Sequence, residues 1–327
     1  MNGGTHSTFP IFALAKSPDR RQFWHKPDIG SGYPQKPLPM LPDPPNFAPE
    51  PGIRIATLPS LAAQGRWRLD GLRAQGSHGY FWITRGQAQI TVRSHTRGAG
   101  TNVLIYVPSG HVHGVALGKN IQGYAVWMHQ DLPVPAPDHT VMIKAASIFE
   151  QGQITSYFEA IAQEDLSRGP GTDHATESWM TLLNVWIDRH QSRNDWQNGA
   201  LDTGGTRLVN RFLERLERDF ARGVAVADLA ATLGVTPTHL SRVCRDYLGK
   251  PASGLLHDRI ILQAKLNLLL EHSSITDIAA GLGIATPAYF SRLFKQQTGR
   301  TPGQFRTDAR AGKIPNPPAK PRRVKPS

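Results

Sequence analysis

The last third of the chain carries two sets of hydrogen-bonding side chains at helical spacing. The first set is Thr238, Ser241, Arg242 and Arg245, and the second is Ser291, Arg292 and Lys295. Residues three or four apart lie on one face of a helix, so each set forms one outward stripe. An arginine can pair bidentately with O6 and N7 of guanine, while Ser, Thr and Lys can contact base edges or phosphates. The chemistry predicted for both stripes is hydrogen bonding to a nucleic-acid duplex.

Both stripes lie in a segment that is repeated. Residues 228–249, DLAATLGVTPTHLSRVCRDYLG, recur as 277–299, DIAAGLGIATPAYFSRLFKQQTG, with ten identical positions and Ala285 as one extra residue. A single arginine could belong to an ordinary solvated helix face. The duplication of the whole pattern favours a shared role in binding.

Each copy has the signals of a helix, a tight turn and a second helix. In the first copy Asp228 lies in the first turn of a short helix, and Gly234 follows where a left-handed residue ends a helix. Thr236 can cap the next helix, and Pro237 fits its first position. The second copy has the same residue types at 277, 283, 286 and 287.

The other faces of the second helices are apolar, as packing requires. They carry Leu240, Val243, Cys244 and Tyr247 in the first copy and Phe290, Leu293 and Phe294 in the second. Residues 252–271 predict one helix that joins the copies. About 20 helical residues span about 30 Å, close to the roughly 34 Å repeat of the major groove. One chain could therefore place both stripes in successive grooves.

Charge divides the 327-residue chain unevenly. Residues 1–203 contain 17 Lys and Arg against 16 Asp and Glu, whereas residues 204–327 contain 20 against 9. This basic excess within a net charge of +12 favours a polyanion as partner of the last third, with simple solubility as the alternative.

The first two thirds are organised differently. Closely spaced prolines predict a flexible arm over 1–51. Residues 52–140 read as short strands, with 80–84 and 87–93 predicted to form a hairpin across Arg85-Gly86. Further strands are expected at 103–107, 112–117 and 123–128, which together favour a small barrel or sandwich.

Residues 141–203 predict a helical linker. Its apolar positions include Ile148, Ile154, Phe158 and Ile161, followed by Trp179, Leu182, Leu183, Trp186 and Ile187. These helices either form a dimerisation seam or cover the barrel. Residues 311–327 predict a basic flexible tail.

Residues 278–306, IAAGLGIATPAYFSRLFKQQTGRTPGQFR, together with the repeat and the joining helix, resemble the signature of AraC/XylS-type transcription regulators. The resemblance implies a DNA-binding domain over 204–310, with recognition helices at Pro237–Leu248 and Pro287–Thr298. It implies the seven residues of the two stripes as DNA contacts. Ala288 stands where the first stripe has Thr238, so the second helix should read bases less.

That family commonly joins this domain to a cupin-like effector-binding barrel, which residues 52–140 could supply. The expected fold class is therefore an α+β multidomain protein with a cupin-like barrel, a helical linker and an all-α domain with two helix-turn-helix units. A small-molecule effector pocket would be lined by His78, Trp82, Tyr106, His113 and Trp127, although aromatic residues on short strands often form plain core.

An enzyme is the competing class. PSGHVH, residues 108–113, resembles the second cupin motif, but the first motif with its paired His and Glu is not matched around His78. A metal site needs three or four placed ligands, so we expect no metal, no cofactor and no catalytic residues. A metal-dependent cupin enzyme with a basic appendage remains the alternative, as does a barrel that only mediates interactions.

The remaining expectations concern compartment and partners. One cysteine, Cys244, excludes an intramolecular disulfide framework, and neither a leader peptide nor a long apolar span is recognisable. We expect a cytoplasmic regulator of promoter DNA that is not bound to a membrane. Expected partners are double-stranded DNA, a small-molecule effector, RNA polymerase if the protein activates, and a second copy of the chain.

Overall fold

The computed structural model describes residues 52–196, 203–270 and 273–314, all of which belong to one compact unit. The predicted arm 1–51 and most of the predicted tail 311–327 lie outside the described residues. Among the described residues, no helix combines the length and apolar character needed to cross a membrane.

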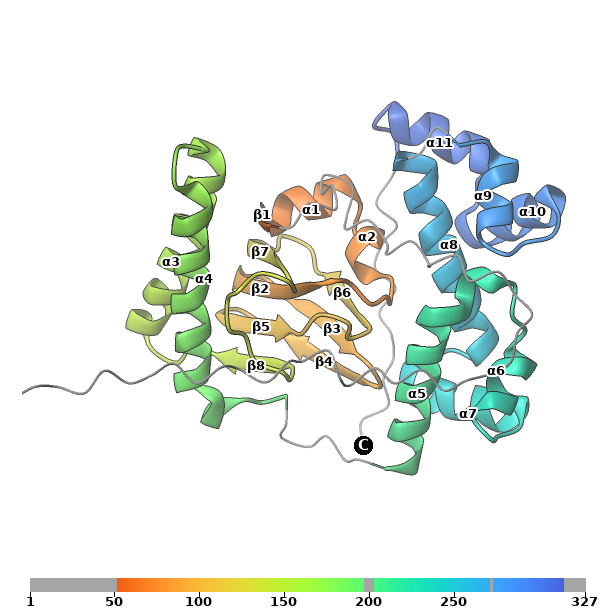
Figure 1. Cartoon of the computed structure of the whole chain (residues 1–327), viewed down its shortest axis with the longest axis horizontal. Helices are drawn as coiled ribbons and strands as arrows, with labels where there is room; N and C mark the ends of the chain where they lie inside the picture. Colours follow the sequence, from red (N-terminus) through yellow and green to blue (C-terminus); the bar gives the residue numbers. More distant parts are fainter. Residues whose placement is uncertain (1–51, 197–202, 271–272, 315–327) are drawn as a thin grey trace, which may run out of the picture. The chain divides into compact units, whose positions relative to one another are not determined.

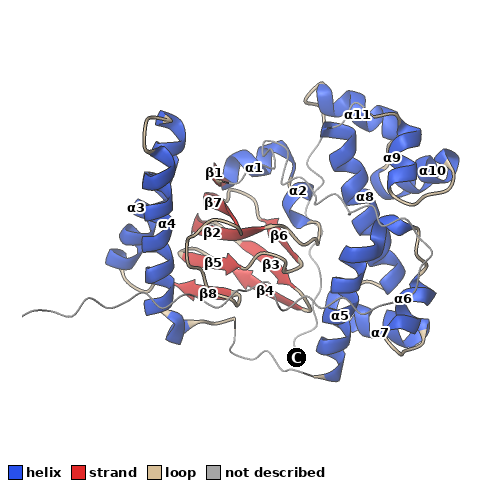
Figure 2. Cartoon of the chain, viewed as in Figure 1, coloured by secondary structure: helices blue, strands red, loops and turns tan. Residues whose placement is uncertain are grey.

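The described N-terminal part contains two antiparallel sheets (Figure 2). The larger has the strand order β1-β7-β2-β5-β8 and the smaller the order β4-β3-β6. The strands are β1 (Ile53–Thr57), β2 (Ser77–Arg85), β3 (Ala88–Val92), β4 (His95–Ala99), β5 (Val103–Val107), β6 (His113–Leu117), β7 (Gln122–His129) and β8 (Val141–Lys144). This sheet-rich part confirms the cupin-like fold class predicted for the N-terminal region.

The larger sheet is buried on both faces. Phe81 and Trp127 face the smaller sheet and pack in one core with Ile90 of β3. Tyr80 and Trp82, on the opposite face of β2, belong to a second core. Because alternate residues of a strand point to opposite faces, double burial explains why YFWI at 80–83 is continuously apolar.

The predicted hairpin between 80–84 and 87–93 is wrong. β2 pairs with β5 and β7, whereas β3 pairs with β4 and β6 in the other sheet. Gly86 lies between them with φ of +90°, and a Cβ there would lie 3.0 Å from Cα of Ile121. The two residues Arg85-Gly86 therefore carry the chain from one sheet to the other instead of closing a hairpin.

Two short helices and the strands β1, β4 and β8 were not individually predicted. The segment after β1 forms α1 (Leu58–Gly65) and α2 (Trp67–Asp70) instead of strands. The Thr57 hydroxyl accepts from the backbone N–H of Ser60, which caps α1. The sheet also continues past residue 140, because β8 pairs with β5.

Helices α3 (Ile148–Ser167) and α4 (Thr172–Arg189) cover the outer face of the larger sheet (Figure 1). Ile154 and Phe158 of α3 and Leu183 of α4 are fully buried there. Ser147 and Glu150 form a capping box at the start of α3. Both helices thus cover the sheet, while Ile148 and Leu182, expected on apolar faces, are exposed.

The C-terminal part is helical and has one core. Its helices are α5 (Gly204–Asp219), α6 (Val226–Thr232), α7 (Pro237–Leu248), α8 (Ala252–Leu270), α9 (Ile275–Gly281), α10 (Pro287–Thr298) and α11 (Pro302–Arg310). Trp67 of α2 packs into this core, with its ring centroid 6.0 Å from that of Phe305. The all-α domain and its joining helix are as predicted.

We expect the free energy of unfolding to depend on pH through His113. Burial lowers the pKa of this side chain to about 4, and the charge of Arg73 also lowers it. An unfolded histidine titrates near pH 6.5, so between that value and the folded pKa the unfolded chain binds a proton that the folded chain does not. Stability therefore falls as pH falls through this window, by up to about 3 kcal/mol.

Replacing His113 with Gln should reduce the loss of Tm between about pH 7 and about pH 5, as followed by circular dichroism. His174→Gln is the matched control, because His174 is exposed on α4. Equal pH slopes in wild type and His113→Gln would contradict the expectation.

Candidate nucleic-acid interface

The first helix-turn-helix unit consists of α6 and α7. The Asp228 carboxylate accepts from the backbone N–H of Ala225 at 3.2 Å and so caps α6. Gly234 has φ of +72° in the turn. The Thr236 hydroxyl accepts from the backbone N–H of His239 at 3.2 Å, and Pro237 opens α7. Each predicted start and stop signal is used.

The second unit, α9 and α10, repeats this construction. Ser274 and Asp277 form a capping box at α9. Gly283 has φ of +69° in the turn, and the Thr286 hydroxyl accepts from the backbone N–H of Tyr289 at 3.3 Å. Because the same local interactions occur twice, α7 and α10 begin and end at corresponding residues.

The seven predicted DNA contacts lie on the outward faces of α7 and α10. Thr238, Arg242 and Arg245 are exposed on α7, and Arg292 and Lys295 are exposed on α10. Ser241 and Ser291 are half-buried at the edges of these faces. The opposite faces are fully buried, with Leu240 and Cys244 in α7 and Phe290 and Phe294 in α10.

Arg242 is held along its own helix by two neighbours. Its Nη2 donates towards Nδ1 of His239 at 3.3 Å, and its Nη1 lies 3.5 Å from Oδ2 of Asp246. Arg292, its counterpart, instead has its guanidinium carbon 5.5 Å from the ring centroid of Tyr289. Gln296 stands where α7 has Asp246, so the second arginine has no carboxylate four residues on.

These three neighbours were not predicted from the sequence. His239 and Tyr289 occupy matched positions of the repeat, three residues before the matched arginines. That spacing places them beside the arginines on a helix. Comparing the non-identical positions of the repeat would have found them.

A buried ion pair fixes α8 against α5. Nε of Arg259 donates to Oε1 of Glu217 at 2.6 Å, and the arginine is almost fully buried. Its guanidinium carbon also lies 3.8 Å from the ring centroid of Phe220. Removing one partner of such a buried pair costs about 3–5 kcal/mol. The pair therefore helps to hold the helix that joins the two units.

Two glycines bring the turn of the second unit into backbone contact with the segment between α5 and α6. A Cβ on Gly283 would lie 2.2 Å from the backbone N of Gly223, and one on Gly223 would lie 2.7 Å from the backbone O of Gly283. Gly223 follows α5, whereas Gly283 is the turn of the second unit. Because neither glycine has a side chain, the turn of the second unit can contact the backbone of Gly223, in the segment that joins α5 to α6.

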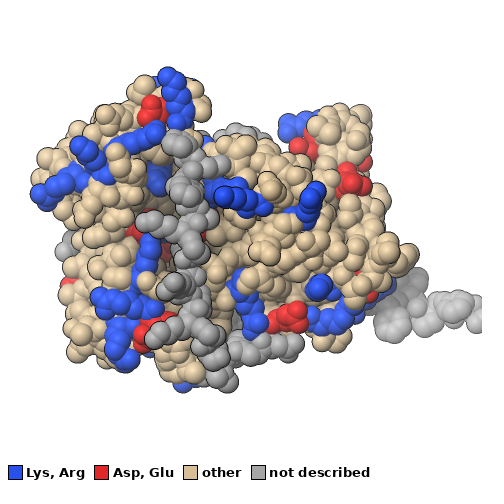
Figure 3. Space-filling model, turned by 180° about the vertical axis from the view of Figure 1, so that it is seen from behind, with Lys and Arg blue, Asp and Glu red and all other residues tan. Residues whose placement is uncertain are grey.

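Basic side chains dominate the surface of the helical part. Seen from behind, Lys and Arg gather over the C-terminal helices with few carboxylates between them (Figure 3). Residues 204–327 account for nearly all of the net charge of +12. Cys244 does not contribute a reactive group, because burial raises the pKa of its thiol to about 12.

The five residues predicted to line an effector pocket do not share one site. Trp82 and Tyr106 pack on the outer face of the larger sheet under α3 and α4. Trp127 faces the smaller sheet, and His113, on β6 of that smaller sheet, lies edge-on against Phe81 of the larger sheet.

His78 joins the outer group. Its Nδ1 lies 2.8 Å from the Tyr106 hydroxyl, which donates to the backbone O of Pro137 at 2.6 Å. The larger sheet therefore separates His78, Trp82 and Tyr106 from His113 and Trp127.

Burial favours the neutral form of three histidines of the sheet part. Burial lowers the pKa of His78, and it lowers the pKa of His111 and His113 to about 4. Within residues 52–196, 203–270 and 273–314, no three His, Cys, Asp or Glu side chains are grouped as a metal site requires.

Comparison with known proteins agrees with this geometry. A family model described as "Helix-turn-helix domain" matches residues 229–308. The probable transcription factor PqrA of Proteus vulgaris is 33% identical over 101 residues, which are 30% of this chain and 83% of that protein. An uncharacterized HTH-type transcriptional regulator of Staphylococcus aureus (strain MSSA476) is 34% identical over 100 residues, 31% of this chain. The chain spans only 13% of that regulator's length.

Solved structures of the same kind also match. The C-terminal domain of AraT from Geobacillus stearothermophilus is 29% identical, with 32% of this chain and 88% of that chain covered and a TM-score of 0.31. ToxT from Vibrio cholerae is 12% identical, with 78% of this chain and 96% of that chain covered and a TM-score of 0.39.

Two helix-turn-helix units with exposed basic faces define the C-terminal part as a DNA-binding domain. The chain belongs to the AraC-type family of helix-turn-helix transcription regulators.

We expect Asp246 to weaken binding to any duplex. Asp246→Gln removes a carboxylate from the outward surface of α7 and releases Arg242, so affinity for a random-sequence duplex should rise several-fold, on the order of 1 kcal/mol or less. The reciprocal change, Gln296→Asp, should lower it. Anisotropy titrations at two salt concentrations measure both effects.

Asp131→Asn is the control for loss of charge alone, because Asp131 is exposed in the sheet part. Shifts of the same sign in Asp246→Gln and Gln296→Asp would show that the carboxylate has no role at this surface.

Proposed function

We propose that the whole chain is a sequence-specific transcription regulator that binds promoter DNA with α7 and α10 in successive major grooves. The observation that carries the proposal is the pair of matched outward faces, both exposed and both backed by buried apolar residues. The Arg259–Glu217 pair and the contact of Gly223 with Gly283 support a fixed arrangement of these faces.

The two helices would contribute unequally. On α7 we assign Thr238, Ser241, Arg242 and Arg245 as base-reading residues, because two guanidinium groups can each pair with a guanine, worth about 1–3 kcal/mol of discrimination. On α10 we assign Ser291, Arg292 and Lys295. That helix has one guanidinium and one ammonium on this face and relies more on phosphate contacts.

Selection of sites from a random duplex pool tests this division in the full-length protein. Arg242→Ala should relax base preference in one half of the selected site. Lys295→Ala should lower affinity for all sequences alike and reduce the salt slope by about one.

Arg168→Ala controls for lost charge, because Arg168 is exposed at the end of α3, away from both recognition helices. Unchanged base preference in Arg242→Ala and in Arg245→Ala would rule out direct reading by α7. A complete loss of salt-dependent binding to DNA would be expected only if the outward side chains of both α7 and α10 were removed.

We further propose that the sheet part responds to a small-molecule effector and that the protein acts in the cytoplasm, contacting RNA polymerase where it activates. A metal-dependent cupin enzyme is disfavoured by the placement of His78 and His113, since the larger sheet separates the two imidazoles. Metal analysis of the purified protein separates the two classes, because stoichiometric iron, nickel or manganese would support the enzyme.

A homodimer is proposed through α3 and α4. Leu182 and Val185 are 45% and 36% exposed on the outward face of α4, and Ile148 and Phe149 are exposed at the start of α3. An apolar surface of this kind is typical of a helix-to-helix interface.

Leu182→Lys should shift the protein to monomer in sedimentation velocity without lowering its Tm, because the side chain is not part of the core. Leu166→Lys, at the other end of α3, is the control. A wild type that sediments as a monomer at all concentrations would contradict the dimer.

A further inference from the structure

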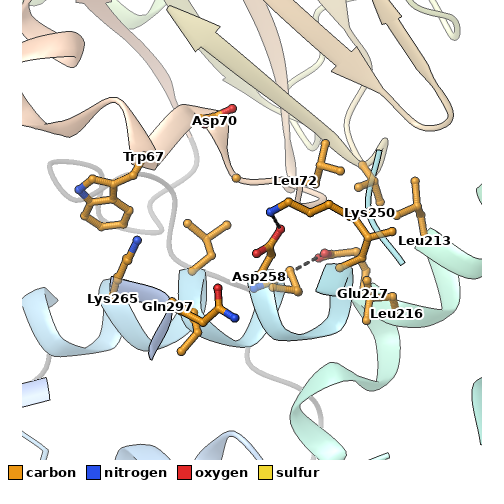
Figure 4. Close-up of a pocket in the computed structure, with 16 residues that line it drawn as sticks. Trp67, Asp70, Leu72, Leu213, Leu216, Glu217, Lys250, Asp258, Lys265 and Gln297 are labelled. Carbon is orange, nitrogen blue, oxygen red and sulfur yellow. Dashed lines mark hydrogen bonds and ion pairs between the residues drawn. The ribbon is translucent and has the colours of Figure 1, made fainter. Parts of the chain in front are cut away.

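A cavity of about 170 Å³ lies between the segment that precedes β2 and the helices α5 and α8 (Figure 4). Trp67 and Leu72 line one side, and Leu213, Leu262 and Lys265 line the other. A space of about 150 Å³ can hold a molecule of the size of benzene, and here charged side chains line part of the wall beside the apolar ones. The space therefore suits one compact organic molecule.

Most charged groups in the cavity wall have partners in the wall itself. The ion pairs are Lys250 with Asp258 and Arg259 with Glu217. Lys265 differs, because no carboxylate of the described residues lies within ion-pair distance of its ammonium group. Its Nζ instead lies 5.2 Å from the ring centroid of Trp67 (Figure 4).

The ammonium group of Lys265 is poorly compensated. Burial lowers its pKa, while the charges of Asp258 and Asp70 raise it and that of Lys250 lowers it. A cation over an aromatic ring is stabilised by the ring, but this gain is smaller than the cost of removing an ion from water. A bound anion would remove this imbalance through a charge-assisted hydrogen bond.

We propose that this cavity is an effector site for a compact monocarboxylate. The carboxylate accepts from Nζ of Lys265, and a body of about six carbon atoms packs against Leu72 and Leu262. A monoanion fits better than a phosphate, because Asp70, Glu217 and Asp258 also line the cavity and would repel a second negative charge. The site is distinct from the predicted pocket of His78, Trp82, Tyr106, His113 and Trp127.

The position of the cavity gives the ligand a route to DNA binding. Trp67 and Leu72 lie in the segment that leads into the larger sheet, whereas Leu262 and Lys265 lie on α8, which joins the two helix-turn-helix units. A ligand that contacts both sides stabilises their contact. If it changes affinity for DNA, DNA changes affinity for the ligand by the same factor. This step rests on the proposed function, whereas ligand binding itself does not.

Sodium cyclohexanecarboxylate tests the site in the full-length protein without DNA, with cyclohexanecarboxamide as the neutral comparison. The acid should raise Tm with concentration and bind at least about tenfold more tightly than the amide by calorimetry, as expected for loss of one charged hydrogen bond. Lys265→Met should lose this preference. Lys119→Met should bind as wild type does, because Lys119 is exposed in the sheet part.

A second signature comes from the unliganded protein. Lys265→Met removes a half-buried cation that has no carboxylate partner among the described residues, so its Tm should equal or exceed that of wild type. Leu72→Phe fills the cavity but keeps Lys265, and it should also block the acid.

Equal binding of acid and amide, unchanged binding in Lys265→Met and Leu72→Phe, or no effect of the acid on wild type would each overturn the site. Anisotropy with a duplex on the same samples keeps the two claims separate. Binding of DNA without binding of the carboxylate would overturn the site alone. Binding of the carboxylate without binding of DNA would overturn only the proposed function.

Discussion

Two recognition helices can read one duplex only if they are held at a fixed distance and angle, and the burial of α8 provides that constraint. Ala264, Leu266 and Leu268 of this helix are fully buried, and its Arg259 is paired with Glu217. The surrounding helices α5, α7, α9 and α11 all pack on the same core as α8. The close approach of Gly223 and Gly283 completes the arrangement, because it leaves no room for a side chain between the second unit and the segment that joins α5 to the first unit.

Much of the helical part could be predicted from the sequence because its signals are local. The bounds Pro237–Leu248 and Pro287–Thr298 follow from a threonine cap, a proline at the first position and a glycine after the last turn. Each of these acts over three or four residues. The outward faces followed from helical periodicity, which also acts within one element. What the sequence does not contain is evidence for what these faces contact, so base reading remains a proposal.

The sheet part was harder because strand pairing is not local. Alternation shows that His78, Tyr80 and Trp82 lie on one face of β2, but the register of β5 and β7 decides which face Tyr106 and Trp127 join. The adjacent strands β2 and β3 looked like a hairpin, yet the chain changes sheets at Gly86. The cavity could not be predicted for the same reason. Lys265 and Trp67 are far apart in sequence, and only tertiary packing brings them together.

The sheet part and the helical part are also joined by specific polar contacts. The backbone N–H of Ser94 donates to Oδ1 of Asn210 at 2.9 Å, and Arg93 lies 3.5 Å from the carboxylate of Glu214. Together with Trp67 in the helical core, these contacts place the turn between β3 and β4 against α5. The sheets and the helices are therefore in direct contact through these residues.

The length of α8 has a consequence for the evolution of binding sites. One residue added to an α-helix turns everything beyond it by about 100° and advances it by about 1.5 Å. An insertion or deletion in α8 would thus turn and shift α10 relative to α7, even though every side chain of α10 was kept. It would also separate Gly283 from Gly223. In the proposed mode of binding, substitutions on α7 and α10 would change which bases are preferred, whereas the spacing of the two half-sites would be tied to the residue count of one buried helix.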